Sequence, residues 1–132
     1  MIEANLVDWI ESDPLLSPII GDRIFPQSVA EDSELPAVTY SVISDQATLA
    51  MSGPTSLRLP RIQLTVVSKT QHQSSQICEL LKKRINAWVA VYPDMVVESC
   101  FAEGGVYLSL DYYVPPRHGQ IIEAYLNWYP IV

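Results

Sequence analysis

Three residues near the C-terminal end of the chain carry groups that could do nucleophilic chemistry. Ser109, Asp111 and His118 bring a hydroxyl, a carboxylate and an imidazole into one short stretch. These are the groups of a serine-hydrolase triad. Ser109 and Asp111 would share one face of a strand, however, and neither a nucleophile elbow nor glycine-framed oxyanion donors surround the serine. We therefore interpret the three as a solvent-facing strand and a polar turn, and we predict no catalytic residues and no enzyme.

The residues that could bind a soft metal are His72, Cys78, Cys100 and His118. His72 and Cys78 would lie on different faces of one helix, so a zinc site would need a chance convergence of distant side chains. The cysteines have no CxxC spacing, which favours reduced thiols over a disulfide framework. Cys78 borders an apolar stripe and is expected in the core. We predict no metal site.

Other polar clusters do not indicate a cofactor. The pair Gly104-Gly105 lacks the lysine and the following helix of a phosphate-binding loop, and is expected to form a turn. The carboxylates of Glu31, Asp32 and Glu34 lack the ligand pattern of a calcium loop and are expected in a solvated loop. The basic run at residues 82–84 is typical of a solvated helix face.

The composition limits the class of protein and its partners. The chain has 132 residues with 15 acidic and 8 basic side chains, a formal net charge of −7. Its length predicts one domain over residues 1–132. An acidic balance without a basic stripe disfavours tight binding of nucleic acid, although an acidic surface could line a passage through which DNA slides. No apolar run approaches the ~20 residues of a membrane span, and no secretory signal is seen, so we expect a soluble, unexported protein.

Apolar residues at helical spacing predict two helices near the N-terminus. Residues 2–11 form an amphipathic pattern that ends at Asp13-Pro14. Asp13 can cap a new turn with Pro14 at its first position, and a short apolar helix would follow, closed by Gly21.

The strongest helical pattern begins after Thr70. Thr70 to Gln73 has the form of a capping box, and an apolar stripe runs from Ile77 to Tyr92 before Pro93. Glu79 and Lys83 have the spacing of an ion pair one turn apart.

Alternating side chains predict the strands. An edge strand is expected at residues 23–27, a half-buried strand at 37–44, a third at 58–68 with Pro60 at its start or at a bulge, and a fourth at 95–101. Residues 45–57 are rich in turn formers and predict a long projecting loop. Residues 106–114 and 122–128 predict a long antiparallel hairpin through a turn at 115–119. Together these elements predict an α+β fold, in which a mainly antiparallel sheet carries an N-terminal helix and one long helix on one face and ends in a C-terminal β-hairpin.

Aromatic residues concentrate in this last hairpin: Tyr112, Tyr113, Tyr125, Trp128 and Tyr129. Aromatic side chains are enriched at protein interfaces, but sheet cores use them as well. Both interpretations stay open for this group.

Three ordered segments resemble a known family. The chain reads Gly21-Asp22-Arg23-Ile24-Phe25-Pro26, then Leu35-Pro36-Ala37-Val38-Thr39-Tyr40, then Arg61-Ile62-Gln63-Leu64-Thr65-Val66 before the long helix. This order and spacing resemble the tail-completion or tail-terminator proteins of tailed bacteriophages, over nearly the whole chain.

The resemblance implies an assembly protein of the virion that is made in the bacterial cytoplasm and carries no cofactor. It implies a ring, usually a hexamer, that caps the tail tube, stops its growth and offers a docking surface to the head-completion proteins of the neck, while DNA passes through without specific binding. The candidate contact residues are in the predicted loop and on the outer strands: Gln46, Thr48, Met51, Ser52, Pro54, Arg58, Tyr113, Tyr125 and Tyr129.

Two alternatives stay open at this stage. One is a head–tail adaptor or other neck protein that binds portal or head parts rather than the tube. The other, more remote, is a small enzyme of unknown type, for which Asp111 and His118 would be the candidates.

Overall fold

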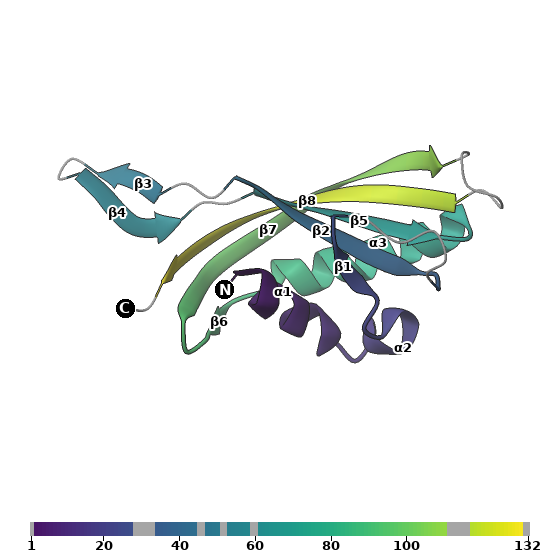
Figure 1. Cartoon of the computed structure of the whole chain (residues 1–132), viewed down its shortest axis with the longest axis horizontal. Coiled ribbons are helices and arrows are strands. Elements are labelled where there is room, and N and C mark those ends of the chain that lie inside the picture. The colour runs from purple at the N-terminus through teal and green to yellow at the C-terminus, as the bar shows by residue number, and fades with distance from the viewer. Residues whose placement is uncertain are drawn as a thin grey trace.

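The helices lie on one face of a long, curled sheet in the computed structural model, and a two-stranded ribbon projects from one end (Figure 1). The structure describes residues 2–27, 34–44, 47–50, 53–58, 61–110 and 117–130. Its helices are α1 (Ile2–Glu11), α2 (Ser17–Ile20) and α3 (Gln71–Asn86). Its strands are β1 (Ile24–Pro26), β2 (Ala37–Ser44), β3 (Ala47–Ala50), β4 (Gly53–Arg58), β5 (Arg61–Ser68), β6 (Ala90–Val91), β7 (Met95–Leu110) and β8 (Arg117–Pro130). The predicted α+β class, with helices on one face and a C-terminal hairpin, is confirmed.

Strand β8 is the central strand of the sheet. It pairs antiparallel with β7 along one edge, over a register that runs from Met95↔Pro130 to Leu110↔Arg117. Its other edge pairs with β5, which pairs with β2, and the short β1 adds in parallel beyond β2. Near the end of β8, the pair Arg58↔Trp128 joins β4, with β3 outside it. Strand β8 therefore connects the body of the sheet to the projecting ribbon.

The core lies between the helices and the inner face of the sheet. The inward positions of the predicted strands, Ile62, Leu64 and Val66 in β5 and Ile122 and Ala124 in β8, are buried as their alternation predicts. From the helices, the residues that are buried there include Leu6, Ile10, Ile77, Leu81 and Ile85. Cys78 is also buried, which confirms its predicted place in the core.

Helix α3 starts as predicted but ends earlier. The Thr70 hydroxyl accepts a hydrogen bond from the Gln73 amide at 3.1 Å, as an N-cap should. The helix ends at Asn86 rather than near Tyr92, because the chain turns there to bury Trp88 and to pair β6 with β7. The predicted ion pair is also different, since Glu79 binds Lys82 at 3.3 Å and not Lys83.

The predicted turn at Gly104-Gly105 is wrong, because β7 runs through both glycines. Gly104 and Gly105 have φ angles of 105° and 121°. The register of β7 against β8 shifts between Gly104 and Val106, which indicates a bulge there. The last residues of the predicted hairpin turn, 117–119, also belong to a strand, since β8 begins at Arg117. Long strands can therefore absorb glycines where the chain must bulge.

The predicted loop at residues 45–57 contains strands. Within it, β3 and β4 pair antiparallel with register Leu49↔Pro54 and Ala50↔Gly53. Proline has no backbone N–H to donate, so it fits a strand position that is not paired on both sides. Pro54 meets this condition, because its described pairing is with β3 alone. Arg58, which was expected in the next strand, ends β4 instead.

The second N-terminal helix is shorter than predicted. The Asp13 carboxylate accepts a hydrogen bond from the Leu15 amide at 3.1 Å, so it caps a turn as expected. Residues 14–16 stay in that turn, however, and α2 begins at Ser17 and ends before Gly21, whose φ is 56°.

Candidate functional site

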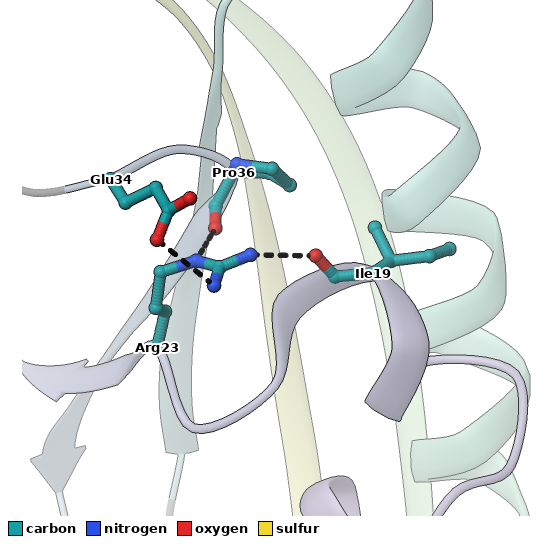
Figure 2. A network of polar contacts seen from close by, with 4 residues as sticks. All are labelled: Ile19, Arg23, Glu34 and Pro36. Atoms are coloured by element: carbon teal, nitrogen blue, oxygen red, sulfur yellow. Dashed lines mark hydrogen bonds and ion pairs between the residues drawn. The ribbon is translucent and has the colours of Figure 1, made fainter.

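Arg23 joins the two N-terminal segments on which the family resemblance depends (Figure 2). Its guanidinium donates to the carbonyl oxygen of Pro36 at 2.8 Å and to that of Ile19 at 2.7 Å. The Glu34 carboxylate lies 3.7 Å from the same group. One side chain thus fixes α2, β1 and the entrance to β2 together. The arrangement holds the two segments together, which is a structural role, because two of the guanidinium donors are used by backbone carbonyls.

The projecting ribbon of β3 and β4, hereafter the arm, holds part of the predicted contact surface. Thr48, Pro54 and Arg58 belong to its strands. Gln46, Met51 and Ser52 lie outside the described residues. In Figure 1 the arm extends away from the helices at the end of the molecule where the N-terminus, β6 and the C-terminus also lie. A two-stranded ribbon is marginally stable by itself in water, so packing against another surface would stabilise the arm.

Tyr125 and Tyr129, also predicted as contact residues, lie elsewhere on β8. Tyr125 is 37% exposed on the sheet face that the helices leave open, and Tyr129 is half-buried opposite Val96. Trp128 is in the core, and Tyr113 lies outside the described residues. The structure therefore divides the predicted residues between two surfaces, the arm and the open face of the sheet.

On the open face, Tyr125 is the centre of a row across three strands. Arg61 of β5 and Phe101 of β7 are its direct neighbours in register. Phe101 is 57% exposed. The Tyr125 hydroxyl donates to the Glu123 carboxylate at 2.7 Å, and this hydrogen bond is the main cause that raises the pKa of Tyr125 above its ordinary value. Large exposed aromatic side chains beside an arginine are typical of protein contact surfaces.

Alternation in the sequence placed Arg61 and Glu123 at outward strand positions, but it did not identify Phe101 and Glu103 as members of this surface. Met95 and Val97 are buried, and strict alternation would place Phe101 inside with them. A register shift between Val97 and Ser99 reverses the phase and turns Phe101 outward. The outward positions of β8 were predictable from the sequence, but the residues of β7 that lie opposite them depend on this bulge.

The residues that were considered for catalysis have other contacts. His118 lies opposite Ser109 in the register of β7 and β8, and its Nδ1 is hydrogen-bonded to the Tyr107 hydroxyl, with the two rings stacked 5.8 Å apart. Asp111 lies outside the described residues. Among the described residues, no group of three or more His, Cys, Asp or Glu side chains could hold a metal ion.

Both cysteines are free thiols with raised pKa values. Burial raises the pKa of Cys100 to about 12, and burial is also the main cause of the raised pKa of Cys78, against a lowering effect of Lys82. A protonated thiol is a poor nucleophile and metal ligand. The basic run at 82–84 differs from the predicted solvated face at two positions, because Arg84 packs over the Trp9 ring and Lys82 is half-buried beside Glu79.

No helix in the described part of the chain is long and apolar enough to cross a membrane. No protein-family model matches the sequence, and no curated protein matches it. Among solved structures, the fold is similar to that of a chain in the virion of a native gene transfer agent particle. The TM-score is 0.68 at 7% sequence identity, and the alignment covers 92% of this chain and 91% of that chain. The two chains share a fold over almost their full lengths.

Proposed function

We propose that this protein is a structural component of a phage-like virion that acts as a tail terminator. In this role a homo-oligomeric ring, a hexamer by the family resemblance, binds the end of the tail tube, stops addition of tube subunits and presents a docking surface to the neck. The protein works by binding alone, without a catalytic step, and DNA passes through the ring.

The observation that carries the proposal is the likeness to a chain of a virion particle over 92% of this chain. The order of the sequence segments supports it independently. Arg23 links the first two segments through the Pro36 carbonyl, so the sequence resemblance rests on residues that hold the fold together.

The arm gives the proposal a physical means of contact. It leaves the body of the domain, and β4 is joined to the sheet in register at Arg58↔Trp128. Exposed apolar side chains occur in β6 and just before it, where Val89 is 64% and Val91 is 76% exposed. We infer that the arm and this end of the molecule bind the neighbouring subunit or the tube.

Strand edges and charge agree with assembly into a ring around DNA. None of the described strands pairs with the outer edge of β3, and β6 pairs with β7 only near its start, so both strands offer edges to another chain. A contact between two different surfaces of one chain closes into a ring when the rotation allows it. The net charge of −7 would repel DNA that moves through the centre.

The test is the length of tails assembled without this protein, measured by electron microscopy. A terminator predicts overlong tails that lack heads, and adding the purified protein should restore normal length. Tails of normal length beside filled heads would contradict the proposal and favour the adaptor function. Variants without residues 47–58, compared with wild type for binding to purified tubes, test the role of the arm directly.

A further inference from the structure

Two opposite surfaces of this domain have complementary chemistry. We infer that the open sheet face of one copy, formed by Arg61, Phe101, Glu103, Glu123 and Tyr125, packs against the outer face of α3 of a second copy. The inference rests on the proposed ring and specifies one of its contacts.

The sheet face offers an aromatic centre. Phe101 and Tyr125 are directly opposite each other on β7 and β8, and they are 57% and 37% exposed. Aromatic side chains and arginine dominate the binding energy of many interfaces. Arg61 lies next to Tyr125 in the same row. These three positions therefore form a compact group of strong contact residues.

The same face carries two carboxylates, Glu103 and Glu123, and one cation, Arg61, so its net charge is negative. Glu103 lies directly opposite Glu123, and like charges at such a position destabilise a sheet. The nearest described ion pair joins Arg61 to Glu123 at 4.0 Å, a long separation. The Arg61 Nε is buried and has no hydrogen-bond partner among the described residues. A partner that brings a cation to the carboxylates and an acceptor to Arg61 would satisfy both.

Helix α3 presents a cation and a hollow on the opposite layer of the molecule. Lys83 is exposed and makes no ion pair with any residue that the structure describes, whereas its neighbour Lys82 is held by Glu79. The hollow has a volume of about 420 Å³ and is lined by His72, Ser75, Gln76, Glu79 and Leu80. The hollow is shallow and open, and Leu80 gives it an apolar side on which an aromatic ring can pack. Lys83 would meet Glu103 and Glu123, and the Phe101 ring would enter the hollow.

A contact of this kind joins two different surfaces, because the helices cover one side of the sheet and the aromatic row lies on the other. Each copy could then bind one neighbour through its sheet and another through α3, which is the geometry that produces rings. A symmetric dimer would use the same surface twice and would bring Glu103 and Glu123 against themselves, which their charge opposes.

Cross-linking tests the contact in the unmodified chain. A 1:1 mixture of isotopically light and heavy protein, concentrated and treated with a zero-length carbodiimide, should give a mixed-isotope peptide pair that joins Lys83 to Glu103 or Glu123. Sedimentation of the same samples measures self-association. A protein that stays monomeric at every concentration, or that associates without this cross-link, overturns the inference.

A charge swap tests its chemistry. Lys83→Glu and Glu103→Lys should each weaken self-association by about tenfold or more, since like charges then face each other across the contact. The double variant should recover most of the wild-type affinity. Lys69→Glu, the same change at another exposed lysine, is the matched control and should leave affinity unchanged. Failure of the double variant to recover, or an equal effect of Lys69→Glu, contradicts the inference.

The proposed function and this contact can be tested separately. If Glu103→Lys still restores tail length but the charge swap has no effect on association, the terminator function stands and this contact is wrong. If the charge swap behaves as expected but tails are of normal length without the protein, the contact stands and termination is wrong.

Discussion

Trp9 and Arg84 bind each other through two reciprocal hydrogen bonds, although they are far apart in the sequence. The Trp9 indole N–H donates to the Arg84 carbonyl oxygen and the Arg84 Nε donates to the Trp9 carbonyl oxygen, both at 2.8 Å. The guanidinium also lies 3.6 Å from the centre of the Trp9 ring and donates to the Ser12 hydroxyl at 2.7 Å. This contact fixes α1 against α3.

We expect Arg84→Met to lower the free energy of unfolding by about 2–3 kcal/mol, because it removes charged hydrogen bonds and a cation–π contact. Urea unfolding followed by tryptophan fluorescence measures the change. Lys83→Met, at the adjacent exposed lysine, should change stability by less than about 0.5 kcal/mol. An equal effect of the two variants would contradict the role given to Arg84.

Arg23→Met should destabilise the protein by about 2–3 kcal/mol, because the Pro36 and Ile19 carbonyl oxygens lose a charged donor. Arg23→Lys should fall between the wild type and Arg23→Met, since one ammonium cannot reproduce the planar two-sided geometry. Thermal unfolding of the three proteins gives the order. If Arg23→Lys is as stable as the wild type, the positive charge alone matters and the two-sided hydrogen bonding of Arg23 in Figure 2 does not.

The two glycines of β7 should differ in their tolerance of alanine. A Cβ at Gly104 would lie 3.1 Å from the Ile121 carbonyl oxygen, which is backbone and cannot move away easily. At Gly105 the nearest atom would be the flexible Lys82 Nζ at 3.6 Å. Both positions have positive φ, so both variants should lose about 1–3 kcal/mol, with Gly104→Ala the less stable. Denaturant midpoints measure the difference, and the reverse order would disprove the assigned bulge geometry.

Burial of Cys100 predicts a dependence of stability on pH in the alkaline range. Its pKa in the folded protein is about 12, above the ordinary value of 9.0 for a cysteine thiol, so the unfolded chain loses the proton first as pH rises. The contribution to stability is complete below about pH 9 and is lost between about pH 9 and 12. Unfolding free energies of wild type and Cys100→Ser, measured from pH 8 to 10, should show the steeper fall in wild type. Parallel curves would mean that the thiol titrates normally in the folded state.

The raised pKa of Tyr125 should depend on Glu123. Glu123→Gln removes the charged acceptor that stabilises the protonated phenol, so the pKa of Tyr125 should fall toward its ordinary value. Carbon-13 labelling of the tyrosine rings and NMR titration resolves this residue from the other tyrosines, with Tyr125→Phe to assign it. An unchanged pKa in Glu123→Gln would show that the hydroxyl has another main partner.

The predictable parts of the fold are those in which local pattern and tertiary packing agree. Residues 2–11, the strand at 37–44 and the cap at Thr70 follow from spacing and side-chain chemistry alone. The boundaries of the other elements depend on tertiary contacts. Trp88 is buried in the core after the helix has ended, and α3 stops at Asn86. The Asn86 side chain accepts a hydrogen bond from the Ala102 amide at 2.7 Å.

The candidate surface was predictable in part for the same reason. Tyr125 was identified because aromatic residues at outward positions of a regular strand are visible in a sequence. Phe101 and Glu103 were missed because their orientation depends on where β7 bulges against β8, which no pattern within β7 reveals.

The pairing of Arg58 with Trp128 has a mechanical consequence. Trp128 belongs to the hydrophobic core and also occupies the register position at which β4 is attached. The arm also lies between β2 and β5 in the chain, so a pull on it reaches these two strands directly and reaches β8 through this pair. A load on the arm is therefore shared by several strands of the sheet, because β8 is paired with both β5 and β7.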